Sequence, residues 1–350
     1  MLKFRELYDP IERTTVMTDE EIGKYASINQ NHPGPVDPAT IKHIHDVFYE
    51  SHTDVDREKL DHMWATIAPR LENNHGLVQF TLDYHGAESE FFFPWLIEIG
   101  KSPSGALELS YGAGYNLAGD WIKEIPHSDP IDAFVRNDPA LVYNRERQLA
   151  TANHVFSFAV ALGIEFGCKV KVVDLGAGRL AWARWHGLQL SPAYETVIAF
   201  DKDPTIDPPK LFDRDMRELG ITYHHGDLMS QIKNPICKDS NIIILGGVAT
   251  YFPFDIFTDA VLAPVHQLLV GRGIFFFDLQ LDCPVFRRNA SIFGWPPMNL
   301  PKTASEAIDM VEQARKRLWH SDIRYGAEYA LDTYNESPTA LMITLTKITP

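Results

Sequence analysis

One short stretch predicts the core of this fold: Lys169-Val-Lys-Val-Val-Asp-Leu-Gly-Ala-Gly-Arg179. Val170 to Val173 form an apolar run typical of a buried parallel strand, and Gly176 to Gly178 predict a tight turn that leads into a helix. Such a turn needs glycine twice, because the chain bends sharply and because its backbone must approach a ligand with no Cβ in the way. Asp174 adds a carboxylate at the end of the strand, where doubly wound sheets bind ligands. The stretch therefore predicts a nucleotide-cofactor turn.

The rest of the carboxyl-terminal half alternates between apolar strands and helices, which favours a parallel sheet covered by helices. Further strands are predicted at 196–200, 221–224, 241–245 and 273–277, and a last helix at 304–319. Two more strands, at 322–329 and 340–346, are joined by a turn, so the last strand should run antiparallel. We predict an α/β fold: a doubly wound, seven-stranded, mostly parallel sheet with an antiparallel last strand.

The amino-terminal part, residues 1–139, is predicted to be a mainly helical cap or lid. Asp37 followed by Pro38 is typical of a helix N-cap with proline at the first helical position. A second helix is predicted from Asp56 to Leu71, because apolar residues recur there at helical spacing. The alternation in Leu77–Leu82 predicts a short strand.

A domain boundary is predicted between Pro126 and Pro139, where prolines and aspartates cluster. A long helix follows from Val142 to Leu162. Residues 140–350 would then form the cofactor-binding domain, with the helical cap before it.

The composition, 45% hydrophobic and 23% charged, is that of an ordinary soluble protein. No apolar run is long enough to span a bilayer and no signal peptide is visible, so we expect a cytoplasmic protein with no membrane partner. The three cysteines lack Cys-x-x-Cys spacing, which suits a reduced compartment. A net charge of −15 argues against a nucleic-acid partner, because such binding surfaces are basic. The histidines near residue 45 lack a ligand pattern with a carboxylate, so no metal site is predicted.

Residues 140–350 resemble the class I S-adenosylmethionine-dependent methyltransferases. Val173–Gly178 matches the first motif of that family, whose glycine turn lies against the amino-acid part of the cofactor. Asp201 matches the acidic residue that accepts hydrogen bonds from the ribose hydroxyls. One departure is Leu180, which stands where the family usually has the third glycine of its Gly-x-Gly-x-Gly turn. The resemblance implies S-adenosylmethionine as the cofactor.

Other positions extend this resemblance beyond the glycine turn. Asp227 would lie near the adenine amino group and Leu228 near the adenine ring, while the segment from Gly246 to Tyr251 would line the transfer site. Asn144, on the helix before the first strand, could bond the amino or carboxylate group of the donor. The predicted cofactor-binding residues are Asp174, Gly176, Ala177, Gly178, Asp201, Lys202, Gly226, Asp227, Leu228, Gly246 and Asn144.

The chemistry implied is transfer of a methyl group to a small molecule, and we expect a role in secondary metabolism. Methyl transfer from a sulfonium is an in-line displacement, so a base is needed only if the acceptor must lose a proton. Candidates for base or acceptor contact are His224 and His225, which end a strand on the ligand side, and Tyr251. Tyr143 could stabilise a sulfonium through its ring.

Three alternatives stay open. Gly176-x-Gly178-x-x-Ala181 also fits the looser fingerprint of dinucleotide-binding dehydrogenases, with Asp201 on the ribose. Gly176–Leu180 is weakly similar to nicotianamine synthase-like proteins, which implies transfer or cyclisation of the aminocarboxypropyl group with release of methylthioadenosine, as in azetidine-2-carboxylate formation. The third is a module that binds the cofactor without turnover. The expected partner is a small-molecule substrate, and a homodimer is left open.

Overall fold

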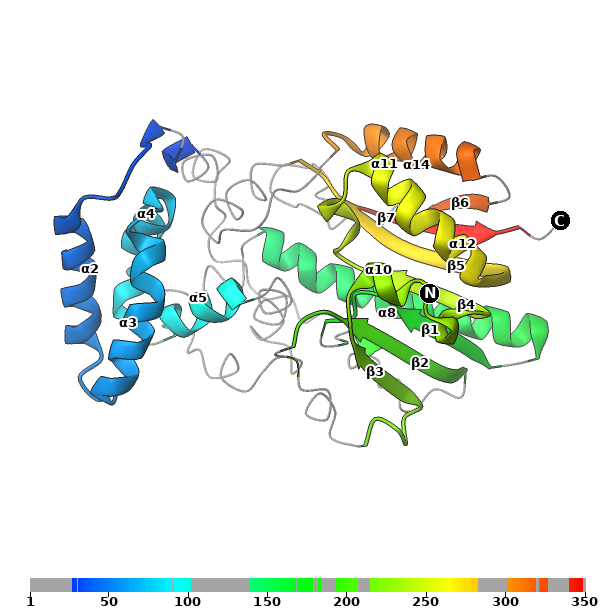
Figure 1. The fold of residues 1–350 in the computed structure, drawn as a ribbon, viewed down its shortest axis with the longest axis horizontal. Helices are drawn as coiled ribbons and strands as arrows, with labels where there is room; N and C mark the ends of the chain where they lie inside the picture. The colour runs from blue at the N-terminus through cyan, green and yellow to red at the C-terminus, as the bar shows by residue number, and fades with distance from the viewer. Residues whose placement is uncertain are drawn as a thin grey trace, which may run out of the picture.

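The computed structural model describes residues 27–29, 31–89, 91–101, 139–167, 169–178, 180, 182–183, 193–204, 206, 215–282, 301–318, 321–326 and 340–348. The predicted boundary between Pro126 and Pro139 lies outside these residues, except for Pro139 itself. Figure 1 shows a twisted sheet with helices on its faces and a separate group of helices from the amino-terminal part.

The strands form a single sheet in the order β3-β2-β1-β4-β5-β7-β6. Their bounds are β1 Val170–Asp174, β2 Tyr194–Asp201, β3 Ile221–His225, β4 Ser240–Leu245, β5 Leu269–Gln280, β6 Ser321–Gly326 and β7 Ala340–Lys347. Strands β1 to β5 pair in parallel, whereas β7 lies antiparallel between β5 and β6. The predicted mostly parallel sheet with an antiparallel last strand is confirmed.

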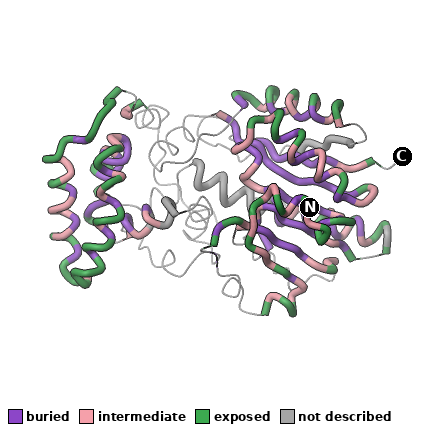
Figure 2. The backbone as a smooth tube through the Cα atoms, viewed as in Figure 1, coloured by how far each residue is buried: buried purple, intermediate pink, exposed green. Residues whose placement is uncertain are grey.

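Helices cover both faces of the sheet, which explains why its strands are apolar on both sides. The face covered by α11 (Phe254–Phe257), α12 (Ala263–Leu268) and α14 (Ala304–Leu318) has its own buried cluster. The opposite face packs against α8 (Pro139–Phe166) through a second cluster. Burial therefore runs along the strands and the inward faces of the helices (Figure 2). The short helices between the strands are α10 Leu228–Gln231, η6 Pro235–Cys237, η7 Ala249–Tyr251 and η8 Thr258–Leu262. One further short helix, η2 Gly86–Glu88, lies in the amino-terminal region.

The strand order brings the predicted site residues to one edge of the sheet. From β1 the chain moves outward to β2 and β3, then returns to place β4 on the other side of β1. Such a reversal leaves a crevice at the carboxyl ends of the two central strands, where ligands of open α/β sheets bind. The turn after β1 and the loop after β4 therefore meet here.

The amino-terminal helices have a hydrophobic cluster of their own. They are α2 (Pro38–Ser51), α3 (Arg57–Leu71), α4 (His75–Asp83) and α5 (Phe92–Lys101). The N-caps of the first two are Asp37 and Asp56, whose side chains accept hydrogen bonds from Ala39 and Glu58. Both helices begin where the sequence predicts.

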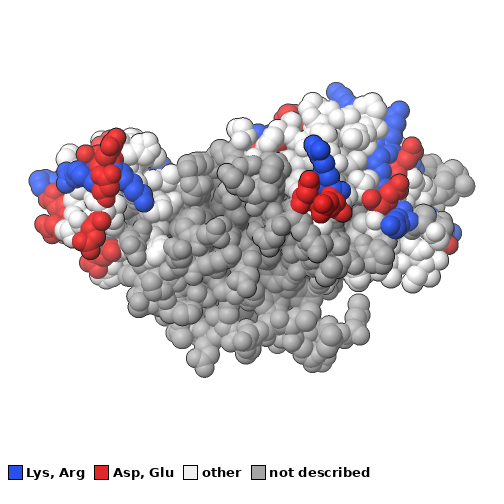
Figure 3. Space-filling model, turned by 90° about the horizontal axis from the view of Figure 1, so that it is seen from below, with Lys and Arg blue, Asp and Glu red and all other residues white. Residues whose placement is uncertain are grey.

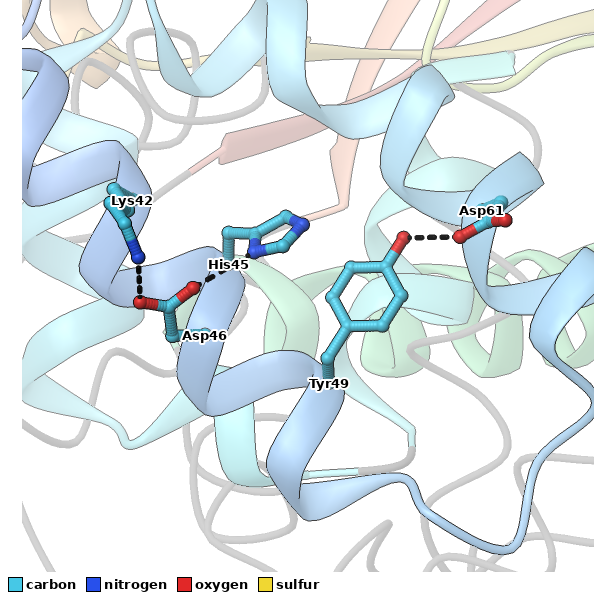
Figure 4. Close-up of polar contacts among 5 residues, drawn as sticks. All are labelled: Lys42, His45, Asp46, Tyr49 and Asp61. Carbon is cyan, nitrogen blue, oxygen red and sulfur yellow. Dashed lines mark hydrogen bonds and ion pairs between the residues drawn. The ribbon is translucent and has the colours of Figure 1, made fainter.

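Exposed polar contacts join α2 to α3 and also lie along α2 itself (Figure 4). The Tyr49 hydroxyl donates to Asp61 Oδ1 at 2.8 Å, and Lys42 and His45 both contact Asp46 along α2. On the face drawn in Figure 3, acidic and basic side chains accordingly lie close together on these helices. No described helix has the length and apolarity needed to cross a membrane.

The predicted strand at Leu77–Leu82 is wrong, because these residues belong to helix α4. Asn74 caps this helix by accepting a hydrogen bond from the Leu77 N–H at 2.9 Å. Leu77, Val78 and Phe80 are all buried, so the helix has little polar face from which a helical period could be read.

Candidate functional site

The glycine turn after β1 is packed tightly against the loop after β4. A Cβ added to Gly176 would lie 2.7 Å from Cγ2 of Val248, so no side chain fits there without a shift. The Ala177 N–H donates to the carbonyl of Phe200 in β2 at 2.9 Å. Gly178 has a φ of +50°, which favours glycine. The turn is thus fixed by the strands on both sides of β1.

Asp174, the last residue of β1, is only 2% exposed. Its Oδ1 accepts from the Gly176 N–H at 3.3 Å, and its Oδ2 accepts from the indole Nε1–H of Trp182 at 2.7 Å. A buried carboxylate is costly unless donors surround it. These hydrogen bonds explain how Asp174 is kept in the interior, and they join the strand end to the turn and to the segment after it.

Asp201, at the end of β2, is joined directly to the glycine turn. Its Oδ2 accepts from the Gly178 N–H at 2.8 Å, and its Oδ1 accepts from the Asp203 N–H at 2.9 Å. Burial raises the pKa of the Asp201 carboxyl above its ordinary value, while these two backbone donors oppose that shift. A carboxylate oxygen can accept more than one hydrogen bond, so Asp201 keeps capacity for hydroxyl donors.

The end of β3 carries two histidines in different surroundings. His225 is exposed and lies beside Asp201 in the register of the sheet. His224 is half-buried, and its ring stacks on Phe200 with centroids 5.1 Å apart. The His224 Nε2 is a buried atom with no hydrogen-bond partner in the described part of the chain. Asp227, two residues beyond His225, is exposed and caps α10 by accepting from Met229 at 2.8 Å.

The loop after β4 is held by Asp278, a residue near the carboxyl end of β5. Gly247, with a φ of +71°, donates its N–H to Oδ1 of the buried Asp278 at 2.5 Å. A Cβ added to its neighbour Gly246 would meet nothing within 4 Å in the described structure. Gly246 thus borders open space, in contrast to the packed Gly176, and Tyr251 follows in the short helix η7.

The position of β7 separates two folds that share the glycine turn. Dinucleotide-binding Rossmann sheets have the order 3-2-1-4-5-6, all parallel. Here an antiparallel β7 lies between β5 and β6. This strand order is that of the class I methyltransferase fold.

No protein-family model and no curated protein sequence matches this chain. Among solved structures it is similar to a possible exported protein from Bordetella parapertussis, with 14% identity over 89% of this chain and 96% of that one and a TM-score of 0.51. Two methyltransferases match with lower scores. Magnesium protoporphyrin IX methyltransferase from Synechocystis PCC 6803, with bound S-adenosylhomocysteine, has 12% identity over 59% of this chain and 85% of that one and a TM-score of 0.39. The plantazolicin methyltransferase BpumL has 12% identity over 73% and 99%, with a TM-score of 0.41. At these identities the likeness concerns the fold alone.

The class I methyltransferase fold brings most of the predicted site residues to the carboxyl edge of the sheet. Those at the ends of β1 to β4 or in the loops that follow are Asp174, Gly176, Ala177, Gly178, Asp201, Lys202, His224, His225, Gly226, Asp227, Leu228, Gly246 and Tyr251. Tyr143 and Asn144 lie in α8, where the described structure gives the helix but not their side chains. Their predicted roles stay predictions.

Two residues of this edge, Asp278 and Trp182, are not among the predicted site residues. Asp278 follows the apolar run of β5, two residues before that strand ends, much as Asp174 and Asp201 follow the apolar runs of β1 and β2, so the same pattern could have found it. The partner role of Trp182 has no local signal, since only folding brings its indole to Asp174. Among the described residues no group of three His, Cys, Asp or Glu side chains could hold a metal ion.

Proposed function

We propose that this chain is an S-adenosylmethionine-dependent methyltransferase that acts on a small molecule. The observation that carries the proposal is the hydrogen bond of 2.8 Å between the Gly178 N–H and Asp201 Oδ2, at the crevice beside β1. It places the turn predicted for the amino-acid end of the cofactor next to the acid predicted for its ribose. Both lie at the edge where this fold binds ligands.

The residues present fit such a cofactor. Asp201 has acceptor capacity beyond its two backbone donors and would take the ribose hydroxyls. Asp227 is exposed at the end of β3 and would accept from the adenine amino group, with Leu228 against the ring. As far as the structure describes the chain, Gly246 borders open space at the end of β4, as a site for a bound molecule requires. When bound, the cofactor supplies an electrophilic methyl group on a sulfonium.

The chain itself has to align an acceptor and exclude water. In-line displacement gains most of its rate from such alignment. His225 is the better placed of the two histidines to contact an acceptor or take its proton, because it is exposed beside Asp201, whereas His224 faces Phe200. Tyr251 lies in the loop after β4, on the other side of the crevice.

The amino-terminal helices complete the proposal as a cap, with residues 1–139 as one unit and 140–350 as the cofactor domain. A cap that encloses the site suits a small acceptor, as in secondary metabolism, better than a nucleic acid or a membrane surface. A cytoplasmic location agrees with this proposal, and a homodimer is compatible with it.

Leu180 is the departure from the family motif that leaves aminocarboxypropyl transfer open as an alternative to methyl transfer. Its φ is +53°, the left-handed conformation for which a glycine would be expected. Leucine at this position therefore does not prevent the backbone bend of the turn. The two reactions differ in the product they leave, so product analysis distinguishes them.

The first experiment is mass spectrometry of the purified protein incubated with S-adenosylmethionine, with and without a cell extract. We expect S-adenosylhomocysteine only when the extract supplies an acceptor. Methylthioadenosine formed without any acceptor would overturn methyl transfer in favour of aminocarboxypropyl chemistry.

The second experiment is calorimetry with S-adenosylhomocysteine. Asp201→Ala should weaken binding by about tenfold or more, because it removes hydrogen bonds to a charged acceptor. The control is Asp215→Ala, which removes an exposed aspartate whose Oδ1 accepts from Arg217 at 2.9 Å in a turn before β3. Unchanged affinity in Asp201→Ala, or no binding by the unaltered protein, would refute the cofactor site.

A further inference from the structure

We propose that Trp182 is a positioning residue of the cofactor site, which acts through Asp174. Its indole N–H holds the Asp174 carboxylate against the glycine turn, so that Asp174 shapes the turn and does not itself contact the cofactor. This inference rests on the proposed function and names a determinant of the same site.

The geometry uses both oxygens of the carboxylate. Oδ2 takes the short hydrogen bond of 2.7 Å from Trp182, which leaves Oδ1 directed at the Gly176 N–H, 3.3 Å away. Hydrogen bonds to an ionised carboxylate are stronger than neutral ones. Asp174 and Trp182 are 2% and 3% exposed, so water does not compete with this pair.

The path of the chain explains how Trp182 reaches β1. The Leu180 N–H donates to the Ala177 carbonyl at 2.8 Å, and the Leu180 carbonyl accepts from the Ala183 N–H at 3.0 Å. The left-handed backbone of Leu180 lies between these two turns. Its side chain is fully buried in the cluster that packs on α8, together with Trp182. A glycine at this position would allow the bend without such an anchor.

Loss of the indole N–H would be felt at the cofactor site. The carboxylate would lose its short hydrogen bond through Oδ2, and the orientation of Oδ1 toward the Gly176 N–H would be less tightly fixed. Two residues further along the same turn, the Gly178 N–H makes the hydrogen bond to Asp201 on which ribose binding depends. A disturbed turn should therefore weaken cofactor binding without removing any cofactor contact.

The test compares the unaltered protein with Trp182→Phe, Asp174→Asn and the double variant, by calorimetry with S-adenosylhomocysteine. We expect each single variant to bind about tenfold more weakly, because each loses a hydrogen bond to or from a buried charged group. The asparagine amide can accept from only one of the two donors, so it conflicts with either Trp182 or Gly176. With phenylalanine at 182 that conflict disappears, and the double variant should bind no more weakly than Asp174→Asn. Affinities within twofold of the unaltered protein in both single variants, or losses that multiply in the double variant, would overturn the inference.

A spectrum separates this inference from the proposed function. In the ¹⁵N-indole spectrum of the full chain, the signal that vanishes in Trp182→Phe should be protected from solvent exchange and should shift in Asp174→Asn. Trp64→Phe, a change in the amino-terminal helices, is the control and should leave both that signal and the affinity unchanged. If the protein binds no S-adenosylhomocysteine, the proposed function fails, and the spectrum alone then tests whether Trp182 holds Asp174. An indole signal that does not shift in Asp174→Asn would refute the Trp182–Asp174 contact.

Discussion

Leu180 combines two properties that rarely occur together: a φ of +53° and a fully buried leucine side chain. The left-handed conformation costs a non-glycine residue roughly 1–2 kcal/mol. Burial of a leucine side chain is worth more, since its truncation to alanine typically costs about 2–5 kcal/mol. The side chain therefore outweighs the backbone strain, which explains how leucine can occupy a position suited to glycine.

This balance predicts an unusual order of stabilities. Leu180→Ala should lose about 3 kcal/mol of unfolding free energy, because it keeps the strained backbone and leaves a cavity. Leu180→Gly should lose less than Leu180→Ala by about 1 kcal/mol, since glycine relieves the strain. The measurement is urea unfolding of both variants.

The matched control is Leu245, which is fully buried at the end of β4 in an ordinary strand. At this position Leu245→Gly should lower the unfolding free energy by about 0.5–1 kcal/mol more than Leu245→Ala, because glycine in a regular strand costs conformational entropy. The same order at both positions would contradict the strain at Leu180.

At the scale of elements, two glycines of neighbouring strands have opposite surroundings. A Cβ on Gly273 in β5 would lie 2.9 Å from the carbonyl oxygen of Val270 and 3.1 Å from that of Ser240, both backbone atoms. A Cβ on Gly246, just beyond β4, would meet none of the described residues within 4 Å. The first glycine serves strand packing, whereas the second leaves room at the crevice.

Alanine substitutions should therefore separate stability from binding. Gly273→Ala should lower the unfolding free energy by about 1–3 kcal/mol, because the backbone of β4 and β5 must shift. Gly246→Ala should change stability by less than about 0.5 kcal/mol but weaken S-adenosylhomocysteine binding, since its methyl group enters the proposed ligand space. Thermal unfolding and calorimetry on the two proteins check both statements. Normal affinity in Gly246→Ala would show that the cofactor lies elsewhere.

At the scale of the whole molecule, the described residues have separate hydrophobic cores. Buried side chains of α2 to α5 form one cluster, and those of the sheet and its helices form two others that share no residue with the first. Separate cores allow separate unfolding transitions. We therefore expect two unfolding transitions, one for the amino-terminal helices and one for the sheet with its helices. Only the second transition should rise in temperature when the cofactor binds.

Scanning calorimetry tests this organisation. Phe48→Ala removes a fully buried ring from the amino-terminal cluster and should lower one transition, while S-adenosylhomocysteine raises the other. Phe277→Ala, which empties the same volume in β5, is the matched control and should lower the transition that the ligand raises. A single transition that both changes move would mean that the two parts unfold as one unit.

By itself, the sequence determined the features that depend on neighbours along the chain. The apolar runs of β1 to β5, the N-caps at Asp37 and Asp56 and the glycine turn at Gly176–Gly178 are local patterns, and the structure has each of them where the pattern lies. Tertiary structure decided which groups meet. Asp201 reaches the Gly178 N–H across 23 residues, and Trp182 reaches Asp174 across a left-handed bend at the buried Leu180. Packing decided these contacts, and it also made Leu77–Leu82 helical, because a helix buried on most sides shows no period in its sequence.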